Sequence, residues 1–492
     1  MNRDAPPSEN GLSQRTFPWK LTLWVAGAAL AALLAFGLWT RYRPGWDTFS
    51  AAAAEAKAAG VPTTYEDYQM SLAFLPDSEN GAIYYEAAFD LLDPQLRPRG
   101  APDLNTAPGG LPLVSRPQQP FPPPGEKVPD KLLADTCAFL DERAEILRLI
   151  KAGSALPRAR YRLVRSSCCI AAWLTSALPR ARYRLEFDGP ATLLPHLSRA
   201  RECVRWLSVA AWLDAVEERP QEAMDKIRQA LALSASLAED GFIVSTSVEN
   251  ACYSIALNAG LLQVLANDAP EDALLEDLQT DFERRAGELS AQKAFEGEML
   301  IFIYVGEAVG QGYTDYLKVY LADGQPSEPH TLMERLSETI AVQDFPLYAA
   351  ANIRMGLAFR EAAANVTPEV LSRPAEYYLP EYPGDKYFRP LRDVVEANRK
   401  ALVAVENARA RFAAAAAGLA AYRFRRDKGR WPDSLGELVD GYMAAVPADP
   451  FTGQALVYLQ MDDGIVIYSV GANLRDDGGR PSLVKSENPQ KD

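Results

Sequence analysis

Histidine is very scarce in this chain. Only His196 and His330 occur among 492 residues, and they lie far apart in the sequence. Zinc sites, two-histidine iron sites and Ser-His-Asp triads all depend on histidine as ligand or base. These classes of site are therefore nearly excluded, and each histidine is interpreted as an ordinary helix or loop residue.

Cysteine is also scarce, and basic residues are outnumbered. The five cysteines show no C-x-x-C spacing, and their odd number does not indicate a disulfide framework. One bridge in an oxidising compartment and buried free thiols are both compatible with the sequence. Lys and Arg total 51 against 65 Asp and Glu, a net charge of −14. Because phosphate binding needs a cationic surface, nucleic acid is not expected as a partner.

Catalytic motifs are missing as well. The sequence contains no G-x-S-x-G elbow, H-E-x-x-H helix, Walker phosphate loop or dinucleotide fingerprint. Glu296 and Glu298 are the best candidates for buried acids, because strongly apolar residues follow them directly. A carboxylate pair also needs a second acid at a fixed distance, which the sequence does not supply. We expect that the chain is not an enzyme; an envelope hydrolase using Glu296 or Glu298 is an alternative.

One long apolar run is present near the N-terminus. Residues 21–40 are twenty consecutive residues without a charge, enough for about 30 Å of helix. Trp19, Trp24 and Trp39 suit the two membrane interfaces. A cleaved signal peptide would have a shorter apolar region followed by a small-residue site. The run therefore predicts a single transmembrane helix in the inner membrane, with residues 1–20 as a cytoplasmic tail and the bulk of the chain on the periplasmic side.

The rest of the chain divides by composition. Residues 41–92 are expected to form juxtamembrane helices, and the Pro- and Gly-rich residues 93–129 a linker or loop. From residue 130 to 402, apolar residues recur three or four apart between short polar or proline turns, which predicts a domain of helical hairpins. Residues 403–480 form a separate module, described below, and 481–492 are expected to be a flexible tail.

The predicted helical domain contains a duplication of ten residues. SALPRARYRL occurs at 154–163 and again at 176–185, an offset of twenty-two. Its arginines alternate with apolar residues at a period of two, which suits a strand or an extended segment. Identity this high indicates a tandem duplication, in which one copy is required and the other is a tolerated loop. The arginines fit either an anion or lipid-headgroup patch or a solvated polar face.

The last eighty or so residues carry the most specific pattern. A long Ala-rich helix ends at Gly429, which can take a left-handed cap, and Pro432 prevents the helix from resuming. A turn at 449–453, Asp-Pro-Phe-Thr-Gly, leads into a strand, and Asp463-Gly464 is a hairpin signal before a second strand. These signals predict one long helix packed on a small antiparallel sheet. The whole chain is thus expected to be mainly α with a small C-terminal α+β module.

This order of features closes with Tyr-Ser-Val-Gly-Ala-Asn and Asp-Asp-Gly-Gly. It resembles the C-terminal half of the major pseudopilin of type II secretion systems, over residues 403–480. In that family the loop after the equivalent of Tyr468-Ser469-Val470-Gly471 binds calcium. The resemblance therefore implies a Ca²⁺ site at Asn473, Asp476 and Asp477, whose oxygen ligands suit this ion. A polar loop stabilised by its own turns is the alternative.

The other end of the chain differs from pseudopilins. Around residues 21–40 there is no short basic leader with a Gly-Phe or Gly-Met cleavage site, and no glutamate five residues into the membrane helix. We therefore expect a membrane-anchored binding or scaffold protein of the bacterial envelope that carries a pseudopilin-like module. Its partners would be envelope or secretion-system proteins, docked on the helical body or the sheet edge. An accessory component of a type II secretion or pilus-like system is the alternative.

Overall fold

The structure is a computed structural model of the chain. It describes residues 45–64, 75–93, 107–115, 119–165, 184–187, 194–267, 270–311, 332–379, 391–439, 441–462 and 464–479, with isolated positions between 67 and 104. The predicted tail 1–20, the predicted transmembrane helix 21–40, the predicted tail 481–492 and His330 lie outside these residues. Among the helices that are described, none is long and apolar enough to cross a membrane.

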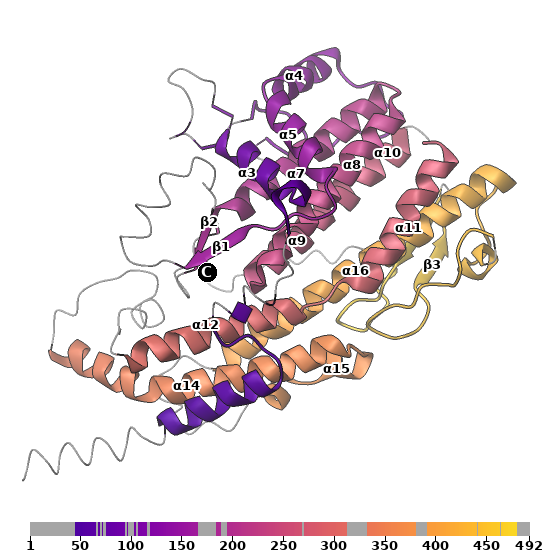
Figure 1. The fold of residues 1–492 in the computed structure, drawn as a ribbon. Helices are drawn as coiled ribbons and strands as arrows, with labels where there is room; N and C mark the ends of the chain where they lie inside the picture. Colours follow the sequence, from indigo (N-terminus) through magenta and orange to yellow (C-terminus); the bar gives the residue numbers. More distant parts are fainter. Residues whose placement is uncertain are drawn as a thin grey trace, which may run out of the picture.

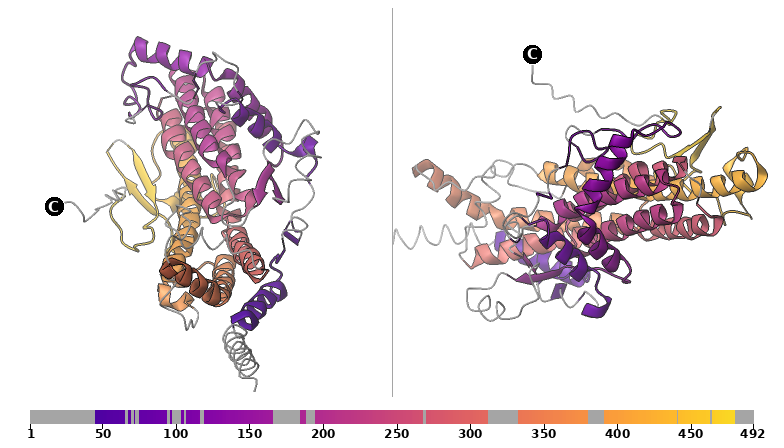
Figure 2. Two further views of the ribbon diagram at one scale, coloured as in Figure 1. Left: turned by 90° about the vertical axis from the view of Figure 1, so that its left-hand side faces the viewer. Right: turned by 90° about the horizontal axis from the view of Figure 1, so that it is seen from above.

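Helices make up 67% of the fold, beside a small antiparallel sheet, which confirms the predicted mainly α class. Figures 1 and 2 show the helices in packed layers, with the C-terminal hairpin on one side of them. Short helical turns join several of the longer elements, and these connecting elements are η1 (Asp77–Glu79), η3 (Leu237–Asp240), α15 (Pro368–Ser372), η5 (Ala375–Tyr378) and η6 (Leu435–Leu438).

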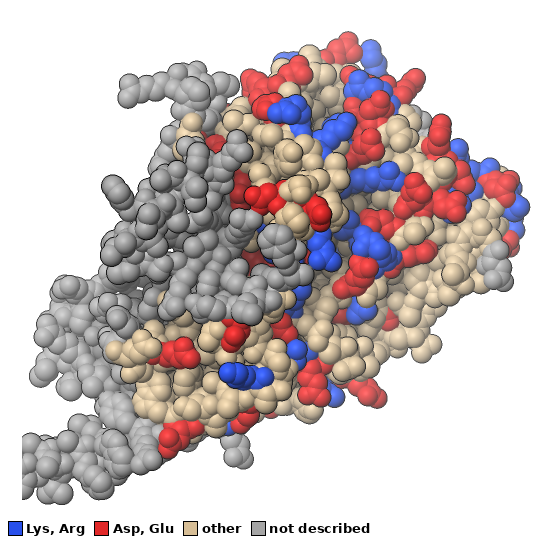
Figure 3. Space-filling model, in the orientation of Figure 1, with Lys and Arg blue, Asp and Glu red and all other residues tan. Residues whose placement is uncertain are grey.

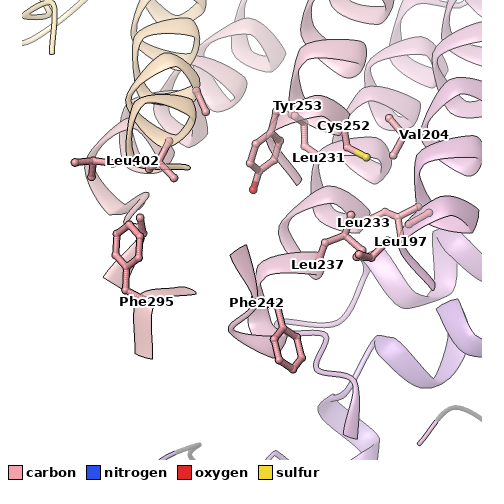
Figure 4. Close-up of a cluster of buried hydrophobic side chains, with 14 of the residues drawn as sticks. Leu197, Val204, Leu231, Leu233, Leu237, Phe242, Cys252, Tyr253, Phe295 and Leu402 are labelled. Atoms are coloured by element: carbon pink, nitrogen blue, oxygen red, sulfur yellow. The ribbon is translucent and has the colours of Figure 1, made fainter. Parts of the chain in front are cut away.

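The centre of the fold is built from α7 (Pro195–Val216), α8 (Pro220–Ala235) and α9 (Ile243–Ser254). Both α7 and α8 begin with proline, whose fixed φ suits the first turn of a helix. Their apolar stripes bury leucines and valines that meet residues of α9, α12 and α16 in one continuous core, part of which is drawn in Figure 4. Cys203 and Cys252 lie in this core as free thiols.

Three shorter helices cover one end of this core: α3 (Ala82–Asp90), α4 (Asp130–Asp141) and α5 (Ala144–Ser154). Apolar residues recur three or four apart over residues 132–150, which predicts one helix. The structure instead has a break between α4 and α5, where the Arg143 side chain points into the protein. The Arg143 guanidinium donates to the carbonyl oxygens of Phe139 and Leu104, each at 2.8 Å, and lies 3.7 Å from the centre of the Phe139 ring. This buried cation is bound by these backbone oxygens and by the Glu142 carboxylate at 3.2 Å.

A second layer of helices contains α12 (Gln292–Gly310), α14 (Leu332–Ala364) and the helical residues 45–58. Gly306 of α12 is needed for close packing, because a Cβ at that position would approach the Phe49 ring to 2.3 Å. An ion pair of 2.8 Å between Glu55 and Arg354 joins the segment 45–58 to α14. The first described helix is thereby fixed against the body of the protein (Figure 1).

The longest helix, α16 (Leu391–Lys428), connects the helical layers to the C-terminal hairpin. It runs without a break across the predicted domain boundary between residues 402 and 403. Phe412 on one face packs against Tyr253 of α9 and Phe282 of α11 (Asp272–Glu288), with ring centroids 4.9 and 5.5 Å apart. A row of alanines beside that face packs against the hairpin.

The hairpin consists of β3 (Val457–Gln460) and β4 (Ile465–Tyr468), paired antiparallel. The predicted arrangement of a long helix against a small antiparallel sheet is present, and Gly429 adopts a φ of 74° at the helix end. Asp449, in the turn before β3, ties the two ends of the hairpin together. Its carboxylate accepts hydrogen bonds from the backbone N–H of Val470 at 2.9 Å and the hydroxyl of Ser469 at 2.8 Å.

The end of each copy of the duplicated segment lies in a strand, one of the two forms expected from its period of two, but the pairing of the two copies was not predicted. Strand β1 (Arg162–Arg165) pairs in parallel with β2 (Arg184–Phe187), and the register places Arg162 opposite Arg184. The offset of this register is the offset of the duplication, so equivalent residues of the two copies lie side by side. The second copy therefore contributes to the fold where it is described, and residues 166–183 lie outside the described part.

Candidate functional site

An apolar groove of about 600 Å³ lies between the helical body and the hairpin. Its size is within the range of about 300–1,000 Å³ that is usual for small-molecule sites. One wall is formed by residues 257–266, the floor by α16, and the other wall by Trp431 and β4. The groove therefore joins three segments that are far apart in the sequence. Figure 2 shows the hairpin beside the helices, with α16 next to it.

The first wall contains a π-helix. α9 continues into η4 (Ile255–Leu261), a π-helical segment, and then into α10 (Leu262–Asn267). Such wide turns occur mostly as short insertions and are frequent at functional sites. Here the segment presents Leu257, Asn258 and Leu261 to the groove, and Leu262 at its rim is 56% exposed. A large leucine side chain is thus held in contact with solvent beside an apolar hollow.

The floor of the groove is one face of α16. The lining residues of this helix recur three or four apart, as expected for a single helical face, and they are Asn407, Ala410, Arg411, Ala414, Ala415, Gly418, Leu419, Tyr422 and Arg425. Four of these nine residues are alanine or glycine, which keeps the floor low along residues 410–418. The hollow therefore follows from the Ala-rich composition of the helix.

Gly418 has no packing reason to be glycine. A glycine in the interior of a helix is about 1 kcal/mol less favourable than alanine. At Gly306 a neighbouring side chain excludes a Cβ, whereas a Cβ built on Gly418, like one on the exposed Gly287 of α11, has no atom within 4 Å. The space above Gly418 belongs to the groove. Glycine is a common choice where a ligand approaches the backbone closely.

Two arginines line the groove. Arg425 lies at its edge with its guanidinium 4.6 Å from the centre of the Trp431 ring, a cation–π contact. Arg411 is half-buried and forms no hydrogen bond or ion pair with another described residue. Burial lowers the pKa of its guanidinium. None of the described lining residues is Asp or Glu.

The loop after β4 contains the predicted calcium ligands. Asn473 donates to Asp477 at 3.0 Å. Asp476 accepts from the Tyr468 hydroxyl at 2.6 Å and from the Gly478 backbone N–H at 2.9 Å. The described residues hold no group of three or more His, Cys, Asp and Glu side chains arranged for a metal. The loop is stabilised by its own hydrogen bonds, and calcium binding stays a prediction.

Glu296 and Glu298 do not form a pair. They are two residues apart on α12 and therefore point to different sides of the helix. The Glu296 carboxylate is bound by Arg360 at 2.5 Å. Burial raises the pKa of Glu298 to about 7, and a hydrogen bond with the backbone at Ile243 opposes this shift. The two candidates thus lie in separate environments.

A second hollow is a polar cavity of about 800 Å³, which was not predicted from the sequence. Glu249 lines it, is almost fully buried and accepts a hydrogen bond of 2.9 Å from the Tyr253 hydroxyl. Burial raises the pKa of Glu249 to about 8. Several charges around this cavity are paired with one another, for example Arg160 with Glu239 at 3.2 Å. The groove, in contrast, contains Arg411, which has no ion-pair partner among the described residues.

His196 belongs to a fully buried polar cluster. Its Nε2 lies 3.4 Å from Asp240 Oδ2, and the same oxygen accepts a hydrogen bond of 2.6 Å from Ser245. Asp240 therefore lies between the serine and the histidine, whereas a catalytic triad needs the histidine between the other two. The cluster joins η3 to α7 and α9 as part of the packing.

The chain has no match among protein-family models, curated proteins or solved structures. Function is therefore inferred from the geometry of the groove and the chemistry of the residues that line it.

Proposed function

We propose that the chain is a binding protein whose groove holds a single hydrocarbon chain. The observation that carries this proposal is the groove of about 600 Å³, whose lining is mostly apolar. At ~30 Å³ for each water-sized group, such as a methylene, a volume of about 600 Å³ accommodates on the order of twenty methylene groups. A single long acyl or alkyl chain fits this size.

The setting of this binding protein is the bacterial envelope. The apolar run at 21–40 supports a membrane anchor, and the resemblance of 403–480 to a pseudopilin module supports a location on the periplasmic side. A hydrocarbon-binding groove suits a protein tethered beside a membrane, where such molecules are concentrated. In this proposal the chain binds and presents a ligand and catalyses no reaction.

An accessory role in a type II secretion or pilus-like system is the second candidate. It is supported by the helix α16 with its antiparallel hairpin, the form that the resemblance implies. Affinity capture of the full chain from solubilised membranes tests it, and recovery of secretion components would support it. Recovery of none of these components would count against it.

Photolabelling tests the proposed groove. The full chain in membranes would be irradiated with photoreactive hexadecanol, and the labelled peptides identified by mass spectrometry. We expect label within residues 257–266, 407–425 and 465–471, and we expect Gly418→Trp to abolish it by filling the groove. Gly287→Trp is the matched control, since Gly287 lies on α11, outside the groove, also with no atom within 4 Å of a Cβ. Labelling spread evenly over the chain, or unchanged by Gly418→Trp, would refute the proposal.

A further inference from the structure

The charges that line the groove have one sign. Arg411 and Arg425 are its charged lining residues, and no Asp or Glu is found among the described lining residues. The chain as a whole has more acidic than basic residues, 65 against 51. On the face drawn in Figure 3, acidic and basic side chains are interspersed. The groove therefore differs in charge from the face drawn in Figure 3, and its two guanidinium groups are complementary to an anion.

Arg411 differs from three other arginines of α16 that form ion pairs. Arg409 is paired with Glu406 at 3.2 Å, and Arg423 with Glu276 at 2.8 Å. Arg399 is paired with Glu396 at 3.4 Å. Arg411 has no such partner among the described residues, although it is half-buried. A guanidinium that has lost part of its hydration is stabilised by a carboxylate, which it can bind through two parallel hydrogen bonds.

The position of Arg411 defines a direction along the groove. Asn407 lies one helical turn before Arg411 on the same face and adds an amide donor. In the other direction, α16 presents Gly418 and Tyr422, which lies roughly 16 Å from Arg411 at ~1.5 Å per residue. This is the length scale of an extended long-chain acyl group. A polar end and an apolar track are thus present in one hollow.

We propose that the ligand of the groove is a long-chain fatty acid, whose carboxylate is bound by Arg411 and whose chain lies over Gly418 towards Trp431. This inference rests on the proposed function and adds the class of head group. Arg425, at the far end beside Trp431, closes the apolar track. The ligand in this proposal is a single-chain carboxylate, since one extended chain matches the distance of roughly 16 Å from Arg411 to Tyr422.

Paired photolabelling tests the head group. The full chain in membranes would be labelled with photoreactive hexadecanoic acid or with photoreactive hexadecanol, at matched concentrations. We expect the acid to label the groove peptides about tenfold more efficiently than the alcohol, as one charge-assisted contact implies. Arg411→Met is expected to remove this preference, so that the acid and the alcohol label the groove peptides equally. Arg399→Met, on the same helix outside the groove, is the control and should retain the preference.

The outcomes separate the two proposals. Labelling of the groove by neither compound overturns the proposed function itself. Equal labelling by both, unaffected by Arg411→Met, overturns only the carboxylate assignment. If Arg411→Met loses both labels, Arg411→Lys decides: retained preference for the acid supports the assignment, and its loss overturns it. Unlabelled hexadecanoic acid should compete with the probe, whereas stronger competition by vesicles of dihexadecanoyl phosphatidylglycerol would overturn the choice of a single-chain ligand.

Discussion

Arg411 and Gly418 lie two turns apart on α16, and both face the same apolar groove. One supplies a cation without a partner among the described residues, and the other leaves an open space that no packing contact requires. Each is unfavourable for a helix that has only to be stable. Together they are the two features on which the proposed ligand site depends.

Gly418→Ala should raise the free energy of unfolding. Alanine is the better helix residue, and its Cβ enters open space, so we expect a gain of about 0.5–1 kcal/mol. Urea denaturation followed by far-UV circular dichroism measures it. Gly306→Ala is the contrasting control, since its Cβ would approach the Phe49 ring to 2.3 Å and the variant should lose stability. A loss of stability in Gly418→Ala would show that the space is occupied by the protein itself.

Arg411→Met should leave the ligand-free protein as stable as before or more stable. The change removes a partly dehydrated cation and adds apolar surface to an apolar groove. Arg423→Met should instead lower the free energy of unfolding by about 1–3 kcal/mol, because Arg423 is buried and donates to Gln279 at 3.1 Å and Glu276 at 2.8 Å. Thermal unfolding of the two variants compares them directly. An Arg411→Met loss as large as that of Arg423→Met would indicate a structural role for Arg411.

Glu249→Gln should change how stability depends on pH. Burial raises the pKa of Glu249 from 4.5 to about 8, so the folded chain keeps a proton that the unfolded chain releases. The contribution of this group to the free energy of unfolding is therefore complete below about pH 4.5 and is lost as the pH rises to about 8. Glutamine does not titrate. The free energy of unfolding of the variant should therefore rise relative to that of the wild type across this pH range, by on the order of a few kcal/mol at its upper end.

Denaturant titrations at several pH values between these limits would measure that difference. Glu298→Gln is a useful comparison, because the pKa of Glu298 rises only to about 7 and its window should close earlier. A constant difference between Glu249→Gln and wild type at every pH would contradict the raised pKa.

Asp449→Ala should destabilise the hairpin. Its carboxylate is almost fully buried and accepts from the backbone of Phe451 and Val470 and from Ser469, so three donors would lose their partner. We expect a loss of about 2–4 kcal/mol. Hydrogen exchange at residues 456–470 would report the opening of the hairpin. Ser469→Ala removes a single one of these bonds and should cost about 1 kcal/mol, and equal effects of the two variants would contradict this account.

The sequence predicts well where apolar periodicity is long and turn signals are strong. The helices from Pro195 to Ala235 and the hairpin at 457–468 follow directly from such patterns. It failed at Arg143, because periodicity does not reveal that a cation will turn inward and interrupt a helix. It also missed the π-helix at Ile255–Leu261, since one extra residue per turn leaves the apolar pattern almost unchanged.

The groove was beyond sequence reasoning for a different reason. Its three parts, at 257–266, 407–425 and 465–471, meet only after the chain has folded. Two local signals were available in retrospect: Gly418 interrupts an Ala-rich helix, and Arg411 follows an apolar position on it. Neither signal identifies a site until the structure shows that the space beside them is open. The calcium loop at Asn473, Asp476 and Asp477 is the opposite case, where the residues are close in sequence and the structure shows them bonded within the loop.

The parallel pairing of β1 and β2 has a consequence for assembly. Where the duplicated segment ends, its two copies lie side by side in matching register, with Leu163 opposite Leu185. Backbone hydrogen bonds do not distinguish one copy from another of identical sequence. The same segment of a second molecule presents the same backbone partner, so we expect that an exchange of strands between molecules would preserve the backbone pairing of this small sheet. Within one molecule, the duplication already provides a strand that pairs with the edge of β1.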